Sequence, residues 1–186
     1  DRNKILVTQG YFLDDEKQYK TNPQYPIGHN QGLFVLVEFI PGLVRIETDH
    51  LATHRLFYWF TERAVVVSNN PIHLLRYLMD HHDIAIDVNK DAALSMLAVS
   101  YVVPPQTLFE GIFSTEPNSL VEISEGGKIK VQKSEYVLHD TSLNFDAETF
   151  DHLFEDSIKR QAALCSPHEP FFAYLSGGLD SRYTCF

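Results

Sequence analysis

The sequence has no excess of positive charge and no long apolar run. Its 15 lysine and arginine residues are outnumbered by 25 aspartate and glutamate residues, which gives a formal net charge of −10. A negative charge of this size opposes non-specific binding to nucleic acid and to anionic membranes. No apolar run approaches the ~20 residues that a membrane-spanning helix needs. We therefore expect neither nucleic acid nor a membrane as a partner.

Cysteine is scarce, and no targeting segment stands at the start. The two cysteines, Cys165 and Cys185, make neither a disulfide framework nor a zinc site. This usage fits a reducing compartment, so we expect a cytoplasmic protein. The sequence starts at Asp1, without methionine and without a charged-then-apolar leader, which we interpret as a processed or recombinant start.

The first two thirds of the chain are rich in predicted strands. The 186 residues, 44% of them hydrophobic, suffice for one large domain or for one domain and part of another. Residues 1–30 are mixed and polar, and we assign no regular element to them. Short apolar or alternating runs then predict three hairpins, formed by residues 33–39 with 43–47, 55–60 with 64–68, and 119–124 with 128–132.

Helices are predicted between and after these hairpins. Asn70 can cap a helix that has Pro71 at its first position. A second helix is predicted over 87–102, with Leu94, Leu97, Ala98 and Tyr101 on one face.

The composition turns polar near 138–146. A helix over 147–164 and a short strand, 171–175, follow, which indicates the start of an α/β unit. The apolar stripe of that last helix consists of Phe150, Leu153, Phe154, Ile158 and Ala162.

The motif most informative about chemistry is Ser-Gly-Gly-Leu-Asp-Ser, at residues 176–181. Adjacent glycines after a strand allow the backbone to approach a ligand closely. A helix starting near Leu179 would leave backbone N–H groups free to bind an anion, and Ser176 and Ser181 add hydroxyl donors. Asp180 is compatible with phosphates if a divalent cation lies between them, and Mg²⁺ prefers this combination of oxygens. The motif lacks the lysine of the common G-x-x-x-x-G-K-[ST] loop.

The motif resembles the SGGxDS pyrophosphate loop of ATP pyrophosphatases, which cleave ATP between the α- and β-phosphates and adenylate a substrate. The resemblance implies that ATP and Mg²⁺ are cofactors, and that Asp180 is the metal ligand. The alternative is a tight Gly-Gly turn capped by Asp180 and Ser181. The residues assigned to the cofactor site are Ser176, Gly177, Gly178, Leu179, Asp180 and Ser181.

Further blocks resemble the glutaminase domain of asparagine synthetases, in the same order and spacing over residues 28–186. Asp49, Leu56, Phe57 and Tyr58 keep the spacing of the segment D-R-x-G-x-x-P-L-Y-Y, with Ala52 in place of glycine and Arg55 in place of proline. Residues 64–78 are similar to the family's strand together with the S-E-x-K-A-L segment that follows it. Residues 104–123 are similar to P-x-T-(I/L)-F-x-G-I-x-x-L-x-P-G, with Pro117-Asn118 in place of Pro-Gly. The whole indicates an asparagine synthetase-like, ATP-dependent amidotransferase.

The sequence also departs from this family. A glutaminase of this type needs a cysteine as its first residue, with the free α-amine as its base. It also needs an Asn-Gly-Glu segment. This sequence has Asp1 at the first position, and Asn30-Gln31-Gly32 is a poor substitute for the segment. We therefore expect no glutamine hydrolysis, unless a start bearing the cysteine was cut away. Family members with shortened N-terminal halves resemble lasso-peptide cyclases and related amide-forming enzymes.

The expected fold is α+β. A sandwich like that of N-terminal-nucleophile (Ntn) hydrolases, residues 1–138, precedes the truncated start of an α/β ATP-pyrophosphatase domain, residues 147–186. We expect the full-length protein to be an AMP-forming carbon–nitrogen ligase that acts on a small-molecule or peptide carboxylate. The protein could form a homodimer. The present chain alone should have no turnover, and no catalytic residue is assigned. The competing hypothesis is a non-catalytic scaffold or protein-interaction domain.

Other candidate sites are weighed as follows. His81-His82-Asp83 could bind a metal, but adjacent residues do not share a helix face, which favours a solvated helix end. His54 with Asp49 could be a catalytic pair, but a turn between strands fits better. Tyr58, Trp59 and Phe60 have no basic neighbours and are more typical of core and edge residues than of a base-stacking platform. Two further candidates are Cys185, interpreted as a packed hydrophobe, and Arg182, which could reach a phosphate or face solvent.

Overall fold

The computed structural model describes residues 4–12, 32–82, 84–133 and 146–163. The chain divides into two compact units, Asp1–Tyr136 and Val137–Phe186, and each is described by itself. The protein is α+β, with antiparallel sheets.

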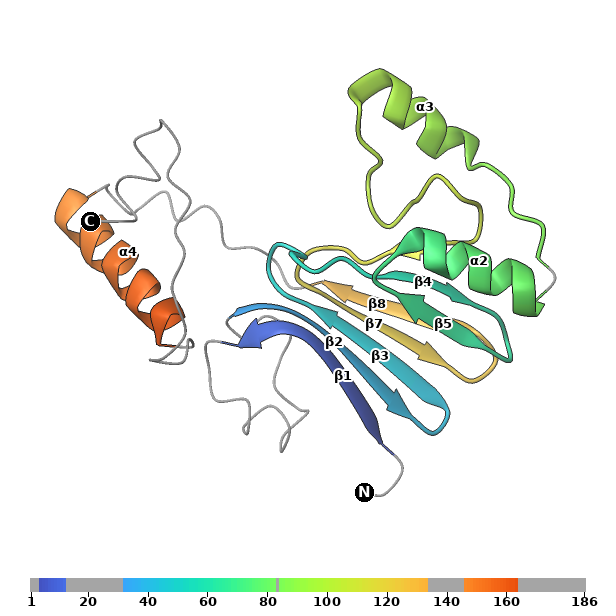
Figure 1. The fold of residues 1–186 in the computed structure, drawn as a ribbon, viewed down its shortest axis with the longest axis horizontal. Helices are drawn as coiled ribbons and strands as arrows, with labels where there is room; N and C mark the ends of the chain where they lie inside the picture. Colours follow the sequence, from blue (N-terminus) through green and yellow to red (C-terminus); the bar gives the residue numbers. More distant parts are fainter. Residues whose placement is uncertain (1–3, 13–31, 83, 134–145, 164–186) are drawn as a thin grey trace. The chain divides into compact units, whose positions relative to one another are not determined.

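A five-stranded antiparallel sheet is the largest element of the first unit (Figure 1), and its strand order is β1-β2-β3-β7-β8. Strands β2 and β3 form a hairpin around Pro41 and Gly42, and the φ of Gly42, +76°, is one that glycine adopts without strain. Strands β7 and β8 form a second hairpin. Both hairpins confirm the sequence prediction. The strands are β1 (Ile5–Phe12), β2 (Gly32–Ile40), β3 (Leu43–Thr48), β7 (Ser119–Ser124) and β8 (Lys128–Lys133).

The assignment of no element to residues 1–30 was wrong for β1. This strand pairs with β2 along its whole length, from Ile5 opposite Phe39 to Phe12 opposite Gly32. It lies at the edge of the sheet, and both Ile5 and Val7 are more than half exposed. Its apolar residues Ile5, Leu6 and Val7 are consecutive, so β1 lacks the clear alternation of a strand that covers a core.

A three-stranded sheet, in the order β5-β4-β6, lies against one face of the large sheet. Residues 57–60 and 65–68 form the predicted second hairpin. The small sheet is buried on both sides: Tyr58 contacts the large sheet, whereas Trp59 contacts the helix α2 (Pro71–His82). Its strands are β4 (Phe57–Phe60), β5 (Val65–Ser68) and β6 (Phe113–Ser114).

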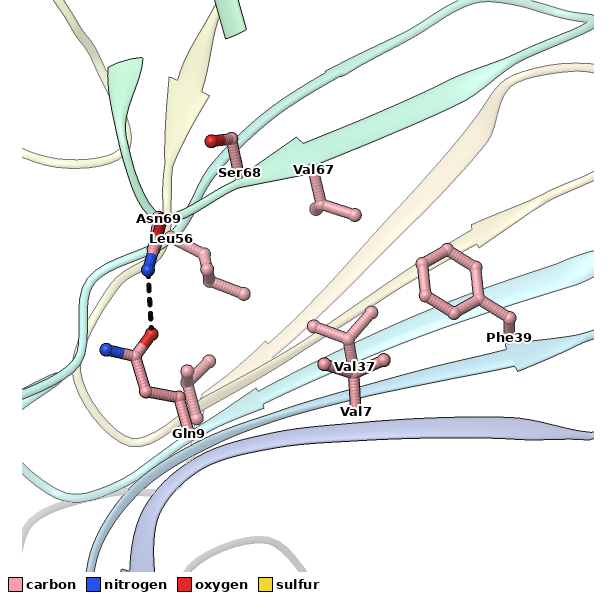
Figure 2. Close-up of a pocket in the computed structure, with 9 residues that line it drawn as sticks. Val7, Gln9, Val37, Phe39, Leu56, Val67, Ser68 and Asn69 are labelled. Carbon is pink, nitrogen blue, oxygen red and sulfur yellow. Dashed lines mark hydrogen bonds between the residues drawn. The ribbon is translucent and has the colours of Figure 1, made fainter. Parts of the chain in front are cut away.

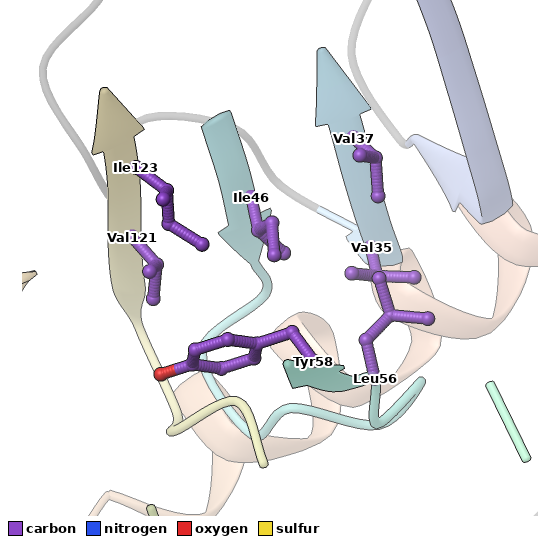
Figure 3. Close-up of a cluster of buried hydrophobic side chains, with 7 residues drawn as sticks. All are labelled: Val35, Val37, Ile46, Leu56, Tyr58, Val121 and Ile123. Carbon is purple, nitrogen blue, oxygen red and sulfur yellow. The ribbon is translucent and has the colours of Figure 1, made fainter. Parts of the chain in front are cut away.

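The core between the sheets is aliphatic around one tyrosine (Figure 3). Alternate residues of β2 and β7 point toward the small sheet, as the period of two in a strand requires. Tyr58 is 2% exposed and stacks with Phe60 and Phe113. The cluster consists of Val35, Val37, Ile46, Leu56, Tyr58, Val121 and Ile123.

The opposite face of the large sheet has a row of alternating charges across its strands. Glu38 lies opposite Arg45, Arg45 opposite Glu122, and Glu122 opposite Lys130. Glu38 is 2% exposed and forms ion pairs with Lys4 and Arg45. Arg45 Nε donates to Glu122 Oε1 at 2.8 Å. Burial opposes the charge of Arg45, but the hydrogen bonds and charges of Glu122 and Glu38 outweigh it and raise the pKa of Arg45. The row joins β2, β3, β7 and β8 through their side chains.

The predicted helices are present with adjusted bounds. Asn70 Oδ1 accepts hydrogen bonds from the N–H groups of Ile72 and His73, which confirms Asn70 as the cap of α2. Helix α3 spans Lys90–Val99 and is capped by Asn89 rather than starting at 87. Among its residues only Ala92 is buried, while Leu94 and Leu97 of the predicted stripe are 64% and 83% exposed.

The second unit is described only in its helix α4, Ala147–Ala162. Asp146 caps it by accepting from the N–H groups of Glu148 and Thr149, and hydrogen bonds from Thr149 and Glu148 lower the pKa of Asp146. The rings of Phe150 and Phe154 stack on the predicted stripe, with centroids 6.0 Å apart. None of the helices in the described segments combines the length and the apolar composition of a bilayer-spanning helix.

Candidate functional site

The sequence-predicted nucleotide site lies outside the described residues. This applies to Ser176, Gly177, Gly178, Leu179, Asp180 and Ser181, and to the strand predicted at 171–175. Arg182 and Cys185 lie outside as well. The assignment of these residues to ATP and Mg²⁺ stays a prediction. The site built below belongs to the first unit.

A groove opens between the two sheets, between strands β1 and β2 on one side and β5 on the other (Figure 2). Its volume is about 360 Å³. The groove arises because the large sheet continues to β1, whereas β5 is the edge of the small sheet among the described residues. Its lining residues are Val7, Gln9, Val35, Val37, Phe39, Leu56, Val67, Ser68 and Asn69.

One end of the groove is polar. Asn69 Nδ2 donates to Gln9 Oε1 at 3.2 Å and so links β1 to the segment after β5. Ser68 Oγ donates to the carbonyl of Asn70 at 3.0 Å and accepts from its N–H at 3.1 Å, so this hydroxyl is engaged in the cap region of α2. Gln9 and Asn69 have further donors and acceptors to offer a ligand.

The described lining of the groove is mostly apolar and has no titratable side chain. Its nine lining residues include no carboxylate, imidazole, thiol or amine. Acid–base catalysis needs a titratable group within hydrogen-bond reach of the reacting atom. Within the described part of the chain, the lining supplies apolar contact, two amide side chains and the hydroxyl of Ser68. No local sequence pattern predicts this groove, because the groove depends on which strands are neighbours across the two sheets.

Asp49 is a structural residue of the turn after β3. Its Oδ2 accepts from the N–H of Phe34 at 3.0 Å, and its Oδ1 accepts from the N–H of Leu51 at 2.7 Å. The N–H of Thr53 also donates to this carboxylate, which is 1% exposed. His54 instead lies against Gly10: a Cβ on Gly10 would come within 2.8 Å of its ring. The interpretation of Asp49 and His54 as a turn, and not as a catalytic pair, agrees with this geometry.

The two histidines at the end of α2 pack against aromatic rings. The ring of His82 lies 5.0 Å from that of Trp59, and the ring of His81 lies 4.5 Å from that of Tyr77. Asp83, the third member of the predicted cluster, lies outside the described residues. A search of the described segments finds no group of three or more histidine, cysteine, aspartate or glutamate residues able to hold a metal ion.

The aromatic run at 58–60 belongs to the two cores, as predicted. Tyr58 is the buried member, and burial together with the Glu116 carboxylate raises its pKa from 10.0 to about 12. The folded protein therefore favours the neutral phenol, whereas the unfolded chain ionises near pH 10.

We expect this difference to destabilise the protein at alkaline pH. The contribution of Tyr58 is complete below pH 10 and is lost as the pH rises toward 12, by about 2–3 kcal/mol over that interval. Urea denaturation at a series of pH values from 8 to 11.5 measures it. The variant Tyr58→Phe cannot ionise, so its free energy of unfolding should fall less steeply above pH 10. Parallel curves for the two proteins would show that Tyr58 titrates normally.

The chain matches no protein-family model and no curated protein.

Proposed function

We propose that the full-length protein is an asparagine synthetase-like enzyme that forms an amide bond at the expense of ATP. The observation on which this depends is the Ser-Gly-Gly-Leu-Asp-Ser motif of residues 176–181. In this proposal its main-chain N–H groups and hydroxyls bind the β- and γ-phosphates, and Asp180 holds Mg²⁺. The first unit would have the finer fold of an Ntn-hydrolase-like sandwich without glutaminase activity.

The proposed reaction has two steps. A substrate carboxylate oxygen attacks the α-phosphorus of ATP, the bond between that phosphorus and the bridging oxygen breaks, and pyrophosphate leaves. An amine, or ammonia, then attacks the acyl carbon, the bond to AMP breaks, and the amine nitrogen loses a proton. The loop would contribute by stabilising the charge that develops on pyrophosphate.

Two backbone angles support the alignment of the first unit with this family. Ala52 and Asn118 stand where the family pattern has glycine, and each has a φ of +49°. This left-handed conformation favours glycine and tolerates asparagine. A diverged member of the family would keep the left-handed backbone angle at these positions even after glycine had been replaced.

Asp49 gives further support. It is the first residue of the D-R-x-G-x-x-P-L-Y-Y segment, and its side chain organises the turn in which Ala52 lies. The N–H of Asn118 in turn donates to the carbonyl of Asp49 at 2.9 Å. Two of the matching blocks therefore meet at one turn.

A non-catalytic role of the first unit is the second candidate. The observation that favours it is the groove, whose lining has no titratable side chain. Under this hypothesis residues 1–136 bind a partner or a substrate segment, whether or not the second unit activates a carboxylate.

Calorimetric titration of ATP into the full-length protein tests the nucleotide site. We expect saturable binding with a dissociation constant of ~1–100 μM when Mg²⁺ is present. The cation is needed because the loop places the Asp180 carboxylate beside the negatively charged phosphates. Removal of Mg²⁺ with EDTA should abolish this binding, and inorganic pyrophosphate should compete with it. Absence of binding in millimolar Mg·ATP, or binding indifferent to EDTA, would contradict the proposal.

A further inference from the structure

Among the described strands, the small sheet ends at β5, whereas the large sheet on the other side of the groove continues to β1. Among the described residues, β5 pairs only with β4, so one of its edges has no strand beside it. Across the groove, Ile5 and Val7 of β1 share the face of Phe39 and Val37. Both are more than half exposed, although this face of the sheet forms the core elsewhere. An apolar sheet face beside a free strand edge is suited to pairing with a further strand.

The groove is continuous with the core between the sheets. Val35, Val37 and Leu56 belong both to the buried core cluster and to the lining of the groove. Val65 and Val67 of β5 also pack against that cluster, whereas Val66 packs on the side of α2. Side chains of a strand added beside β5 would therefore alternate in the same way, with every second one entering the groove.

The charge of the groove restricts its occupant. The chain has a formal net charge of −10, yet all nine lining residues are uncharged. A charged side chain placed there would lose its hydration without gaining an ionic partner. At the polar end, Gln9 and Asn69 can bind the main chain or a polar side chain of the occupant. The volume of about 360 Å³ lies within the usual range of binding pockets.

We propose that the groove binds an extended, uncharged peptide segment of a partner protein, which adds as a strand to the edge of β5 that no described strand pairs. The main chain of the peptide would pair with β5, and its alternate aliphatic side chains would cover Val7 and extend the core. Affinity would come from main-chain hydrogen bonds, and selectivity from the apolar groove. This inference does not depend on the nucleotide site.

The test uses a capped peptide of alternating threonine and valine and the chain of residues 1–186. We expect saturable binding with a dissociation constant below ~1 mM. Hydrogen exchange at the amides of residues 65–68 should slow on binding. A peptide methylated on alternate main-chain nitrogens should bind at least ~10-fold more weakly, because it lacks the donors for strand pairing.

Two matched substitutions locate the site. Val7→Lys places a charge in the groove, whereas Val131→Lys places one on the same sheet face at β8, where the side chain is 42% exposed. We expect Val7→Lys to weaken binding at least ~10-fold and Val131→Lys to leave it unchanged. Circular dichroism checks that both variants fold, and the methylated peptide gives an independent answer if Val7→Lys does not.

Four results would overturn the proposal. They are absence of binding to the wild-type chain, equal binding of the methylated peptide, equal binding to a folded Val7→Lys variant, and complete protection of the residue 65–68 amides before peptide is added. The last result would mean that another segment of this chain, or a second copy, already occupies the edge; sedimentation of the chain as a dimer would identify the second copy.

Discussion

Replacement of Asp49 by alanine should lower the free energy of unfolding by about 2–4 kcal/mol, because one buried and two partly buried N–H donors lose their acceptor. The N–H groups of Phe34, Leu51 and Thr53 all donate to this carboxylate, at 3.0, 2.7 and 3.1 Å. An unsatisfied buried N–H costs ~1–3 kcal/mol, and water can reach only part of this turn. The loss should appear in urea denaturation at pH 7 as a lower midpoint.

Two variants control this measurement. Asp49→Asn keeps one acceptor oxygen but turns an amide NH₂ toward N–H donors, so we expect about half the loss. Asp80→Ala removes an exposed carboxylate from α2 and should change stability by less than ~0.5 kcal/mol. A loss below ~1 kcal/mol in Asp49→Ala would show that the turn does not depend on this side chain.

Local sequence patterns predicted the hairpins and α2 because the relevant signals lie close together in the chain. The alternation in residues 43–47 and the turn residues before it gave the β2–β3 pairing, and Asn70-Pro71 gave the start of α2. Tyr58 and Trp59 are adjacent but belong to different cores, because the small sheet is covered on both faces. A continuous apolar run is the expected pattern for such a strand.

The features that the sequence analysis missed depend on contacts between distant segments. Strand β1 is apolar at both ends but is interrupted by Thr8, Gln9 and Gly10. Gly10 has a φ of +97°, and its backbone lies close to Leu33 and His54. The pairing of β1 with β2 is what makes it a strand. The groove exists because the described part of the small sheet ends at β5, whereas the large sheet continues to β1. Hydrophobic periodicity within a segment does not show how many strands each sheet contains.

Helix α3 shows the same limit. Leu94, Leu97 and Ala98 of its predicted stripe lie in the helix, whereas Tyr101, the fourth member, lies beyond the C-cap at Ser100. The periodicity did not indicate which face would be covered, and the residue buried in the structure is Ala92. A helix with apolar residues on both faces has no single stripe from which its packing could be derived.

The most direct test of the central claim is the exchange of labelled pyrophosphate into ATP, catalysed by the full-length protein in the presence of a carboxylate substrate. If residues 176–181 bind the pyrophosphate end of ATP through Mg²⁺ held by Asp180, the wild-type protein exchanges label and Asp180→Ala loses at least ~100-fold. The matched control Asp156→Ala, on the exposed surface of α4, should exchange as the wild type does. Undiminished exchange in a folded Asp180→Ala variant would contradict the account.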